Sequence, residues 1–424
     1  MIIFLYTLIF TAFLNECNGT LGGGCFAPST TDDFDIDEFE YQGDFIRFAC
    51  ITTESQDNFD ITDVNGIIPS DLVDRLNNGK GLSLFFHGVS YMIDPLFDSL
   101  FYFAKQWFEA SRNNICVVSY AYTTPSTEVL KIYAIVNKMI KTRRLEYVAK
   151  MARDLVFGVR GKCLATTERT CLRNFSQVDV TGFSFGAHIA GRTCQYLLQK
   201  THEKVRMLLA LDPIKTPRFG PKIKDSIKKG DADYVQVVHT SKKVGMWDQM
   251  GDVDIYVKYE KQKNMGSLND EHGVAFFIHL GTSTNRLYMW ARENGNGSVW
   301  TQKGKALHDE CTIGVYGILK SQHRGKKLGL WLAKRNAENF WEGIGSFNLA
   351  EQVLPPQEIL KEEEIAPENE CGICFRNKKN ARLNCACKNP EICMTCWNEW
   401  KSKPTSQSKC PICRQKVTSA KRVN

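Results

Sequence analysis

The chain has 424 residues, 43% hydrophobic and 24% charged, which is ordinary for globular protein and leaves room for one large and one small domain. Its net charge of +7 is modest for this length, and no basic stripe interleaved with aromatic residues occurs, so we expect no nucleic-acid partner. Eight of the sixteen cysteines lie within residues 371–413, and the others are scattered. This uneven use of sulfur predicts two domains of different kinds.

The N-terminus begins with an apolar run over residues 1–14 that is too short to span a bilayer comfortably but suits the core of a signal peptide. We therefore expect a signal peptide over residues 1–19 and a secreted protein. The run lacks a basic segment before it. A buried strand or helix is the alternative, and in that case the uncleaved protein stays in the cytoplasm.

The long middle part of the chain, from about 45 to 345, alternates short apolar runs with amphipathic stretches. Apolar residues spaced near 3.6 positions predict a helix over 128–157. Strands are expected at 83–86, 115–120, 178–181, 207–211 and 234–238. This alternation predicts an α/β fold, with a mostly parallel central sheet covered by helices on both faces. We assign this domain to residues 20–347.

A G-x-S-x-G pentapeptide, Gly182-Phe183-Ser184-Phe185-Gly186, directly follows one of these expected strands and precedes a small-residue helix. That context is typical of a nucleophilic serine on a tight turn between strand and helix. Flanking glycines permit such a turn, and the helix N-terminus behind it favours developing negative charge. We therefore predict Ser184 as a nucleophile rather than as part of a structural turn.

A serine nucleophile needs a base, and the base needs an acid that orients it. In hydrolases with this turn the chain order is serine, acid, histidine. Asp212 ends the next apolar strand and precedes a proline that stops it, which favours Asp212 as the acid over a buried capping role. His272 is the expected base. His239 and His279 compete with it, but their positions suit a satisfied core histidine and a packed helix residue.

An oxyanion hole requires two backbone N–H groups directed at the developing charge. The residue after the nucleophile, Phe185, is one expected donor. Val89, in the loop that follows Phe86-His87-Gly88, is the other.

The chain resembles the pancreatic-lipase family over roughly residues 45–345. The matching segments follow the family's order: Arg47-Phe48, Phe86-His87-Gly88, Ile115-Cys116-Val117, Gly182 to Gly191, Leu211-Asp212-Pro213, Pro217-Arg218-Phe219, Asp231 to Thr240, Gly251 to Tyr256, and His272. The resemblance implies an α/β-hydrolase, a triad of Ser184, Asp212 and His272 that needs no cofactor, and lipid esters at a membrane or lipid surface as substrate.

The chain departs from the family at several points. Phe183 stands where the family usually has histidine, and the family's C-terminal β-sandwich is absent. Only fifteen residues, without a cysteine, separate Tyr256 from His272, which is too short for a two-helix lid. Short-lid relatives include phospholipases A1, so the resemblance favours phospholipid over triacylglycerol. Cys163 and Cys171 are close enough in sequence to pair, and Cys194 is expected to be a buried thiol.

The C-terminal part begins after an acidic linker, expected over residues 348–370, that contains few residues able to form a core. Beyond it, eight cysteines in four pairs supply enough thiolates for two tetrahedral Zn²⁺ sites. Four disulfides are the alternative. The pairs are Cys371 and Cys374, Cys385 and Cys387, Cys393 and Cys396, and Cys410 and Cys413. A domain this small needs such cross-links, and we assign it to residues 371–415, followed by a basic tail over 416–424.

This pattern resembles a RING-type zinc finger, in which the ligand pairs interleave. The resemblance implies one zinc on Cys371, Cys374, Cys393 and Cys396 and the other on Cys385, Cys387, Cys410 and Cys413. It departs from most RING fingers in having Cys387 where they have histidine. Contacts for a ubiquitin-conjugating enzyme are implied at Ile373, Trp400 and Pro411, and Arg414 is implied as the cation that braces ubiquitin.

Three functions follow from the sequence. The first is a lipid carboxylic-ester hydrolase, phospholipase A1-like, with an appended zinc domain. The second is a RING-type ubiquitin ligase whose lipase-like domain binds substrate or membrane. The third is a catalytically inactive lipase-fold binding protein. The first and second functions require different compartments. A signal peptide directs the chain out of the cytosol, whereas a ubiquitin ligase needs the cytosolic ubiquitin machinery, and reduced thiols that bind zinc are also typical of the cytosol.

Overall fold

The structure is a computed structural model of the whole chain. It describes residues 35–55, 57–89, 93, 100–122, 129–165, 171–216, 223, 226–259, 268–345, 381–384, 394–401 and 416–422. The chain divides into two compact units, residues 1–40 and 41–424. Of the first unit only the turn at residues 35–40 is described. The predicted signal peptide and the linker at 348–370 lie outside the described residues.

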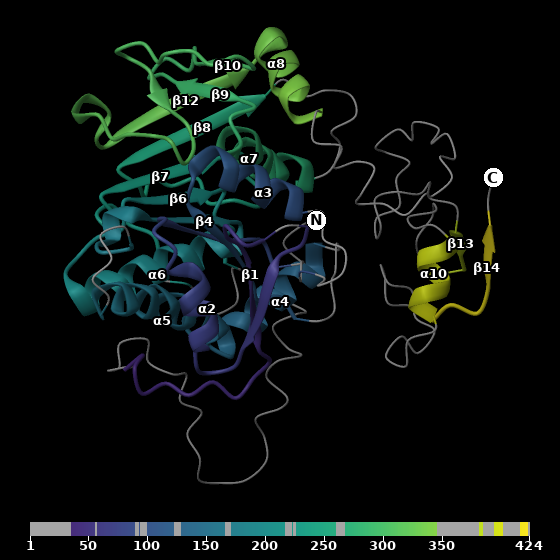
Figure 1. Cartoon of the computed structure of the whole chain (residues 1–424). Helices are drawn as coiled ribbons and strands as arrows, with labels where there is room; N and C mark the ends of the chain where they lie inside the picture. The colour runs from purple at the N-terminus through teal and green to yellow at the C-terminus, as the bar shows by residue number, and fades with distance from the viewer. Residues whose placement is uncertain are drawn as a thin grey trace. The chain divides into compact units, whose positions relative to one another are not determined.

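A nine-stranded mixed sheet is built from strands between residues 46 and 332, with the strand order β12-β8-β7-β6-β5-β3-β4-β1-β2 (Figure 1). Its seven strands from β12 to β4 run parallel, and β1 and β2 are antiparallel at one edge. The bounds are β1 Ile46–Ile51, β2 Asp60–Val64, β3 Leu82–Phe86, β4 Asn114–Ser119, β5 Val178–Phe183, β6 Met207–Leu211, β7 Tyr234–His239, β8 Val253–Tyr259 and β12 Lys326–Leu332. The expectation of a mostly parallel sheet is confirmed.

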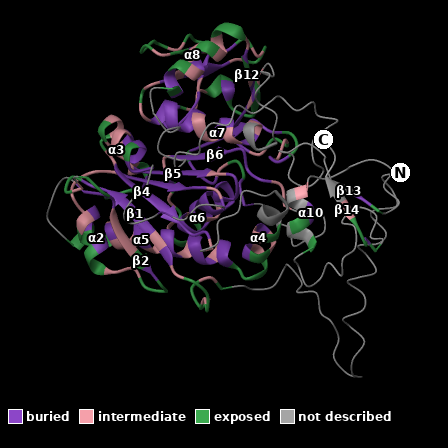
Figure 2. Ribbon diagram, turned by 90° about the vertical axis from the view of Figure 1, so that its right-hand side faces the viewer, coloured by how far each residue is buried: buried purple, intermediate pink, exposed green. Residues whose placement is uncertain are grey.

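Helices cover both faces of this sheet. The helices α4, α5 and α6, with α2 against α5, form one layer, while α3, α7 and α8 lie on the other face. Their bounds are α2 Ser70–Leu76, α3 Leu100–Ser111, α4 Val129–Lys141, α5 Arg144–Ala165, α6 Phe185–Thr201, α7 Leu268–Ser283 and α8 Lys334–Gly345. Figure 2 shows the strands buried between these layers, with exposed residues on the outer sides of the helices. Parallel strands covered on both faces are expected to be apolar throughout, and β3, β4, β6 and β7 are buried at every position.

Smaller elements complete the described chain. A three-stranded antiparallel sheet and two 3₁₀ turns lie within residues 171–345, and a two-stranded antiparallel sheet and a helix lie within residues 381–422. They are β9 Tyr288–Ala291, β10 Ser298–Trp300, β11 Cys311–Thr312, η1 Phe175–Gln177, η2 Ser321–His323, β13 Ala381–Leu383, α10 Met394–Lys401 and β14 Ala420–Arg422. Within the described residues, none of the helices combines the length and apolar character that a bilayer crossing requires.

The predicted helix over 128–157 is wrong in one respect, because it is two helices. The break falls between α4 and α5 at Arg143, whose φ of 55° lies in the left-handed region that a continuing helix excludes. Apolar spacing continues through the break, so periodicity alone could not reveal it.

Among the described residues, disulfides join two pairs of cysteines. Cys163 at the end of α5 is bonded to Cys171, as the sequence allowed, and Cys50 on β1 is bonded to Cys116 on the neighbouring β4. Cys194 is a buried free thiol, as expected. The Cys50–Cys116 bond connects β1, which lies between β4 and the edge strand β2, to the parallel part of the sheet.

His279 on α7 is fully buried among Phe85, Phe103 and Trp107, whose ring centroids lie 4.7–5.4 Å from its own. Neither ring nitrogen has a hydrogen-bond partner within the described part of the chain. Burial lowers the pKa of His279 to about 3. This packed, neutral role agrees with the sequence expectation for His279.

His279 should make the protein sensitive to acid. Between about pH 6.5, the usual histidine pKa, and pH 3, only the unfolded chain takes up this proton. The stability linked to His279 is therefore complete above about pH 6.5 and is lost as the pH falls. The free energy of unfolding, measured with urea at several pH values between about 3 and 6.5, should rise with pH in both proteins. Its rise should be less steep in His279→Leu than in the unchanged protein, by about 1.4 kcal/mol per pH unit. An equally steep rise with pH in the two proteins would contradict this role of His279. His308→Gln, at an exposed position, serves as the control.

Candidate active site

Ser184 lies in the tight turn between β5 and α6. Its φ of 60° and ψ of −121° place a non-glycine residue in a strained region of backbone conformation. The surrounding chain holds this conformation, because the Ser184 N–H donates to Leu211 O at 2.9 Å and Ser184 O accepts from Ile214 N–H at 3.3 Å. The predicted strand–turn–helix context is therefore present, and the turn is attached to the segment after β6.

The two glycines of the pentapeptide permit close packing around this turn. A Cβ at Gly186 would lie 2.2 Å from Phe86 O, and a Cβ at Gly182 would lie 2.2 Å from Gly186 O. Side chains at either position would force α6 away from β3 and β5. The glycines thus allow the first turn of α6 to lie directly against the end of the sheet.

Asp212 follows β6 and is fully buried. Its Oδ2 accepts a hydrogen bond from His272 Nδ1 at 2.6 Å, and its Oδ1 accepts from the backbone N–H groups of Thr240 at 2.8 Å and Ser241 at 3.1 Å. These donors stabilise a carboxylate that burial alone would penalise. The structure thus brings Asp212 and His272 together as a bonded pair, although they are 60 residues apart in sequence.

His272 directs its other nitrogen away from Asp212. With Nδ1 as the donor to the carboxylate, a neutral ring presents Nε2 as an acceptor. Nε2 has no hydrogen-bond partner among the described residues. The ring lies 4.8 Å from that of Phe183, the residue before Ser184. No hydrogen bond joins Ser184 to His272 in the described residues, a common condition without substrate, because such bonds often tighten only in the complex.

The loop after β3 lies against the same turn. A Cβ at Gly88 would be 3.5 Å from the Phe183 ring and 3.7 Å from Ser184 Cβ. Val89, the next residue, is buried beside this contact. Phe185 is the first residue of α6, and the first N–H groups of a helix have no partner within it. The two expected oxyanion donors therefore belong to segments that meet at Ser184.

His87 holds this loop in place. Its Nδ1–H donates to Gly88 O at 2.6 Å, its Nε2 lies 3.3 Å from Ser119 Oγ, and its ring stacks on Tyr120 with centroids 5.0 Å apart. The Tyr120 hydroxyl donates to His87 O. Burial lowers the pKa of His87 to about 4, so the ring is neutral at pH 7. His87 acts on the geometry of the loop and is not placed to transfer protons.

His239, the second competitor for the base, is fully buried at the end of β7. Its Nε2 contacts Asp254 Oδ1 at 3.0 Å, and its Nδ1 contacts Met246 O at 2.9 Å. The Met246 N–H in turn donates to Pro213 O at 2.7 Å. His239 is a satisfied core histidine, as expected, and it fastens the segment that donates to Asp212.

Sequence reasoning missed the contribution of residues 240–246. The backbone of Thr240 and Ser241 binds Asp212, and Gly245 lies so close that a Cβ there would be 2.3 Å from Asp212 Oδ1. The Ile214–Gly245 bridge places the segment alongside the chain that follows Asp212. Backbone donors leave no mark on residue type, so only the glycine could have drawn attention to this segment.

The predicted zinc ligands cannot be placed. Seven of the eight cysteines lie outside the described residues, and Cys396 lies on α10 without a described side chain. The predicted contacts Ile373, Pro411 and Arg414 are also outside, and Trp400 is placed only as a backbone position on α10. Among the residues that are described, no group of three or more His, Cys, Asp or Glu side chains could hold a metal. The zinc sites and the ubiquitin-machinery contacts remain predictions.

Comparison with known proteins finds similarity to lipases. The family model described as Lipase matches residues 139–267, a segment that contains Ser184 and Asp212 but ends before His272. Over the matched segment the chain is therefore lipase-like, which agrees with the α/β fold and with the strained serine turn.

Individual relatives extend this similarity. Phospholipase A1 4 of Polistes dominula is 33% identical over 88 residues, which are 21% of this chain and 28% of that protein. Phospholipase A1 1 of the same organism is 24% identical over 278 residues, 61% of this chain and 74% of that protein. Vitellogenin-3 of Drosophila melanogaster is 33% identical over 99 residues, 23% of this chain and 24% of that protein. The chain thus matches about a quarter of the length of two of these relatives.

Gly245→Ala should lower the reactivity of Ser184, although residue 245 is predicted to act on Asp212 and not on the serine itself. The added methyl group must displace the Asp212 carboxylate, and a misplacement of about 1 Å in such a site costs on the order of 100-fold in rate. The measurement is the rate at which a fluorophosphonate labels Ser184. Gly161→Ala is the matched control, because a Cβ there has open space on α5. Equal labelling rates in the two variants would show that this contact does not position Asp212.

Proposed function

We propose that the lipase-like region, residues 45–345, hydrolyses carboxylic esters of lipids, with phospholipids as the substrate class. The observation that carries this proposal is the buried Asp212–His272 hydrogen bond, with the unpartnered His272 Nε2 on the side of the ring away from the carboxylate. The strained Ser184 turn beside it and the similarity to phospholipases A1 support the same reading. Among lipid esters, the short segment between Tyr256 and His272 favours phospholipid.

The proposed reaction uses Ser184 as nucleophile. His272 Nε2 takes the hydroxyl proton as Ser184 Oγ attacks the ester carbonyl carbon, and Asp212 stabilises the imidazolium that forms. The N–H groups of Phe185 and Val89 stabilise the negative charge on the carbonyl oxygen. When the tetrahedral intermediate collapses, the bond to the alcohol breaks and His272 gives its proton to that oxygen. Water then releases the fatty acid from Ser184 by the same steps.

Ser184→Ala should abolish release of fatty acid from phospholipid vesicles. Loss of the nucleophile in a hydrolytic triad lowers kcat by on the order of 10⁶, and Asp212→Asn should lower it by about 10⁴ because the carboxamide no longer fixes the imidazole. Exposed Ser176→Ala is the control. Fatty-acid release that survives in Ser184→Ala would disprove the proposed role of this serine.

A lipase-fold binding protein without activity is the second candidate, favoured by the likeness to Vitellogenin-3. The same assay separates the two, because the binding protein should release no fatty acid even in its unaltered form. The presence of all three triad residues supports the hydrolase.

We further propose that the eight C-terminal cysteines hold two Zn²⁺ ions, and a ubiquitin ligase activity of this segment is the alternative role to a structural one. Elemental analysis of the purified full chain should give two zinc ions per protein, falling to about one in Cys371→Ser/Cys374→Ser because these residues share one site. A metal-free chain with the eight cysteines paired as disulfides would contradict the proposal.

A further inference from the structure

A cavity of about 410 Å³ lies at the edge of the sheet, on β8 and β12. These strands run parallel, with Tyr256 opposite Gly329 and Lys258 opposite Trp331. Since paired residues point to the same face, Tyr256, Lys258, Lys327 and Trp331 project from one face of this strand pair. Gly329 lies between Lys327 and Trp331 on this face and places no side chain between them.

The walls of the cavity are two fixed segments. On one side Trp247 packs against the rings of Tyr256 and His239, with centroids 5.0 and 5.9 Å away. On the other side lies the turn at residues 293–295, whose Gly295 Cα would be 3.0 Å from a Cβ on Gly329. The turn is bonded to the outer edge of β12, because Gly295 O accepts from Trp331 N–H at 3.1 Å.

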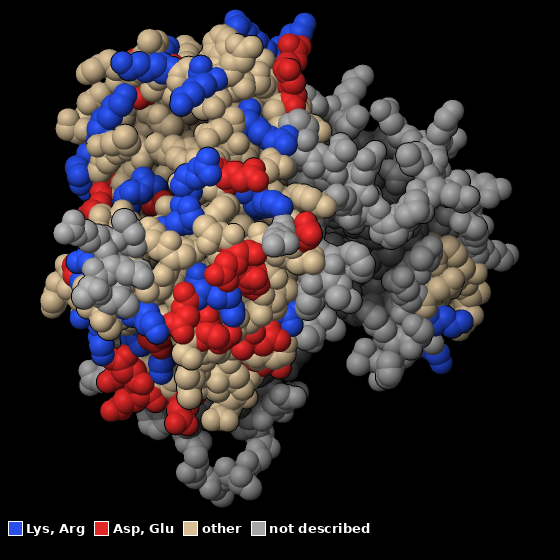
Figure 3. Space-filling model, in the orientation of Figure 1, with Lys and Arg blue, Asp and Glu red and all other residues tan. Residues whose placement is uncertain are grey.

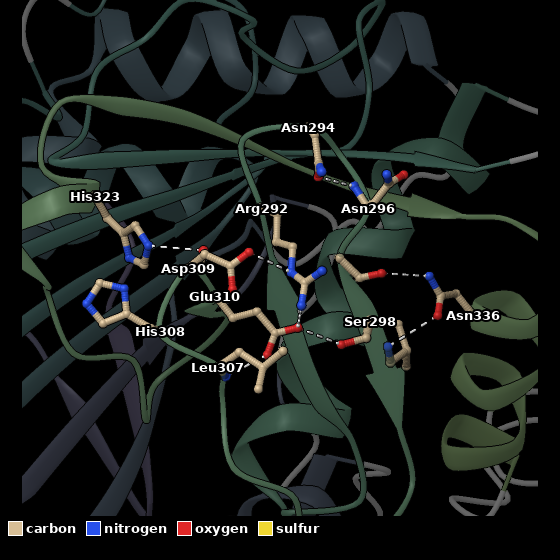
Figure 4. A network of polar contacts seen from close by, with 12 residues as sticks. Arg292, Asn294, Asn296, Ser298, Leu307, His308, Asp309, Glu310, His323 and Asn336 are labelled. Carbon is tan, nitrogen blue, oxygen red and sulfur yellow. Dashed lines mark hydrogen bonds and ion pairs between the residues drawn. The ribbon is translucent and has the colours of Figure 1, made fainter.

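Polar contacts of neighbouring residues fix the position of the turn at residues 293–295 (Figure 4). Arg292, directly before the turn, binds Glu310 with Nη2 3.0 Å from Oε1, and Ser298 Oγ donates to the same oxygen at 3.2 Å. Both backbone groups of Arg292 also bond to Gly329. The cavity is therefore formed in advance of any ligand.

Charge in the cavity is mainly positive. Lys242, Lys258 and Lys327 line it, and none of them forms an ion pair within the described residues. The lining carboxylate, Glu293, is already paired with Lys326 at 3.0 Å. Asp248 lies near Tyr256 but does not line the cavity. In the view of Figure 3, Lys and Arg side chains predominate over Asp and Glu in the upper part of the molecule, where Figure 1 labels β8 and β12.

Aromatic surface accompanies this charge. Trp331 is 55% exposed, and the Lys242 Nζ lies 5.3 Å from the centroid of the Trp247 ring. An exposed indole beside ammonium groups suits a ligand with an anionic head and an apolar or ring-shaped body, because tryptophan offers a large flat surface and lysine acts as a point charge for phosphate.

We propose that this cavity binds the phosphate group of an organic phosphate ester, with Lys242, Lys258 and Lys327 around the phosphate and Trp331 against the organic part. The ligand is either a phospholipid headgroup at a bilayer surface or a soluble phosphate ester. The site does not depend on Ser184 acting as nucleophile. It is nevertheless close to the candidate active site in the chain, since Lys242 directly follows Ser241, whose N–H binds Asp212.

The test measures binding of the full-length Ser184→Ala protein, in which hydrolysis cannot alter the vesicles. Partitioning onto phosphatidylcholine vesicles is compared with and without phosphatidic acid, and glycerol 3-phosphate is added as a soluble competitor. Lys258→Gln/Lys327→Gln should weaken binding to the anionic vesicles by roughly tenfold or more, since each lysine near such a surface contributes severalfold. Lys258→Arg/Lys327→Arg should keep most of the binding because it keeps the charge.

The matched control is Lys303→Gln/Lys305→Gln, which removes the same charge from exposed positions outside the cavity. A change below twofold in this control supports a localised site. Competition by glycerol 3-phosphate then shows that the soluble ester is recognised, and its failure to compete assigns the bilayer headgroup. Equal losses in the two glutamine pairs, or no binding of either probe, would overturn the proposal. Because Ser184 is absent throughout, a protein without hydrolase activity can still bind, so the two proposals fail separately.

Discussion

The hydrogen bond between Asp212 and His272 is the interaction on which the rest of the candidate site depends. A fully buried carboxylate is stable only if its oxygens are satisfied, and here one oxygen is bound by the imidazole and the other by two backbone N–H groups. The backbone donors come from the segment that His239 fastens through Met246 and Asp254. The imidazole is thus oriented by a carboxylate that is itself fixed by the main chain.

Parallel strands explain why these residues meet. Ser184, Asp212 and the segment after His239 each follow the carboxyl end of a strand, and β5, β6 and β7 are neighbours in the sheet. In open parallel sheets the carboxyl ends of the strands all lie at the same end of the sheet, which is where such folds place their sites. His272 reaches this carboxyl end of the sheet from α7, and the loop with Val89 reaches it from β3. Residues distant in sequence are thereby gathered without any local signal of their contact.

The sequence predicted the features that leave a mark on residue type. Strands at 207–211 and 234–238, the turn at Ser184 and the Asp212–His272 pair follow from apolar runs, a glycine-flanked serine and a family resemblance. The break at Arg143 left no mark, because apolar spacing continues through it, and the segment at 240–246 acts through its backbone. The edge cavity arises from the pairing of β8 with β12 and from a turn bonded to Gly329, relations between segments that no stretch of sequence displays alone.

A crystal structure of the protein after reaction with a phosphonate ester would test the central claim most directly, because the phosphonyl group resembles the tetrahedral intermediate. The account predicts a covalent bond from Ser184 Oγ to phosphorus. It also predicts the phosphonyl oxygen about 2.7–3.1 Å from the N–H nitrogens of Phe185 and Val89, and His272 Nε2 in hydrogen-bond reach of Oγ with the Asp212 bond intact. An unmodified Ser184, or a phosphonyl group with His272 turned away from it, would contradict the account.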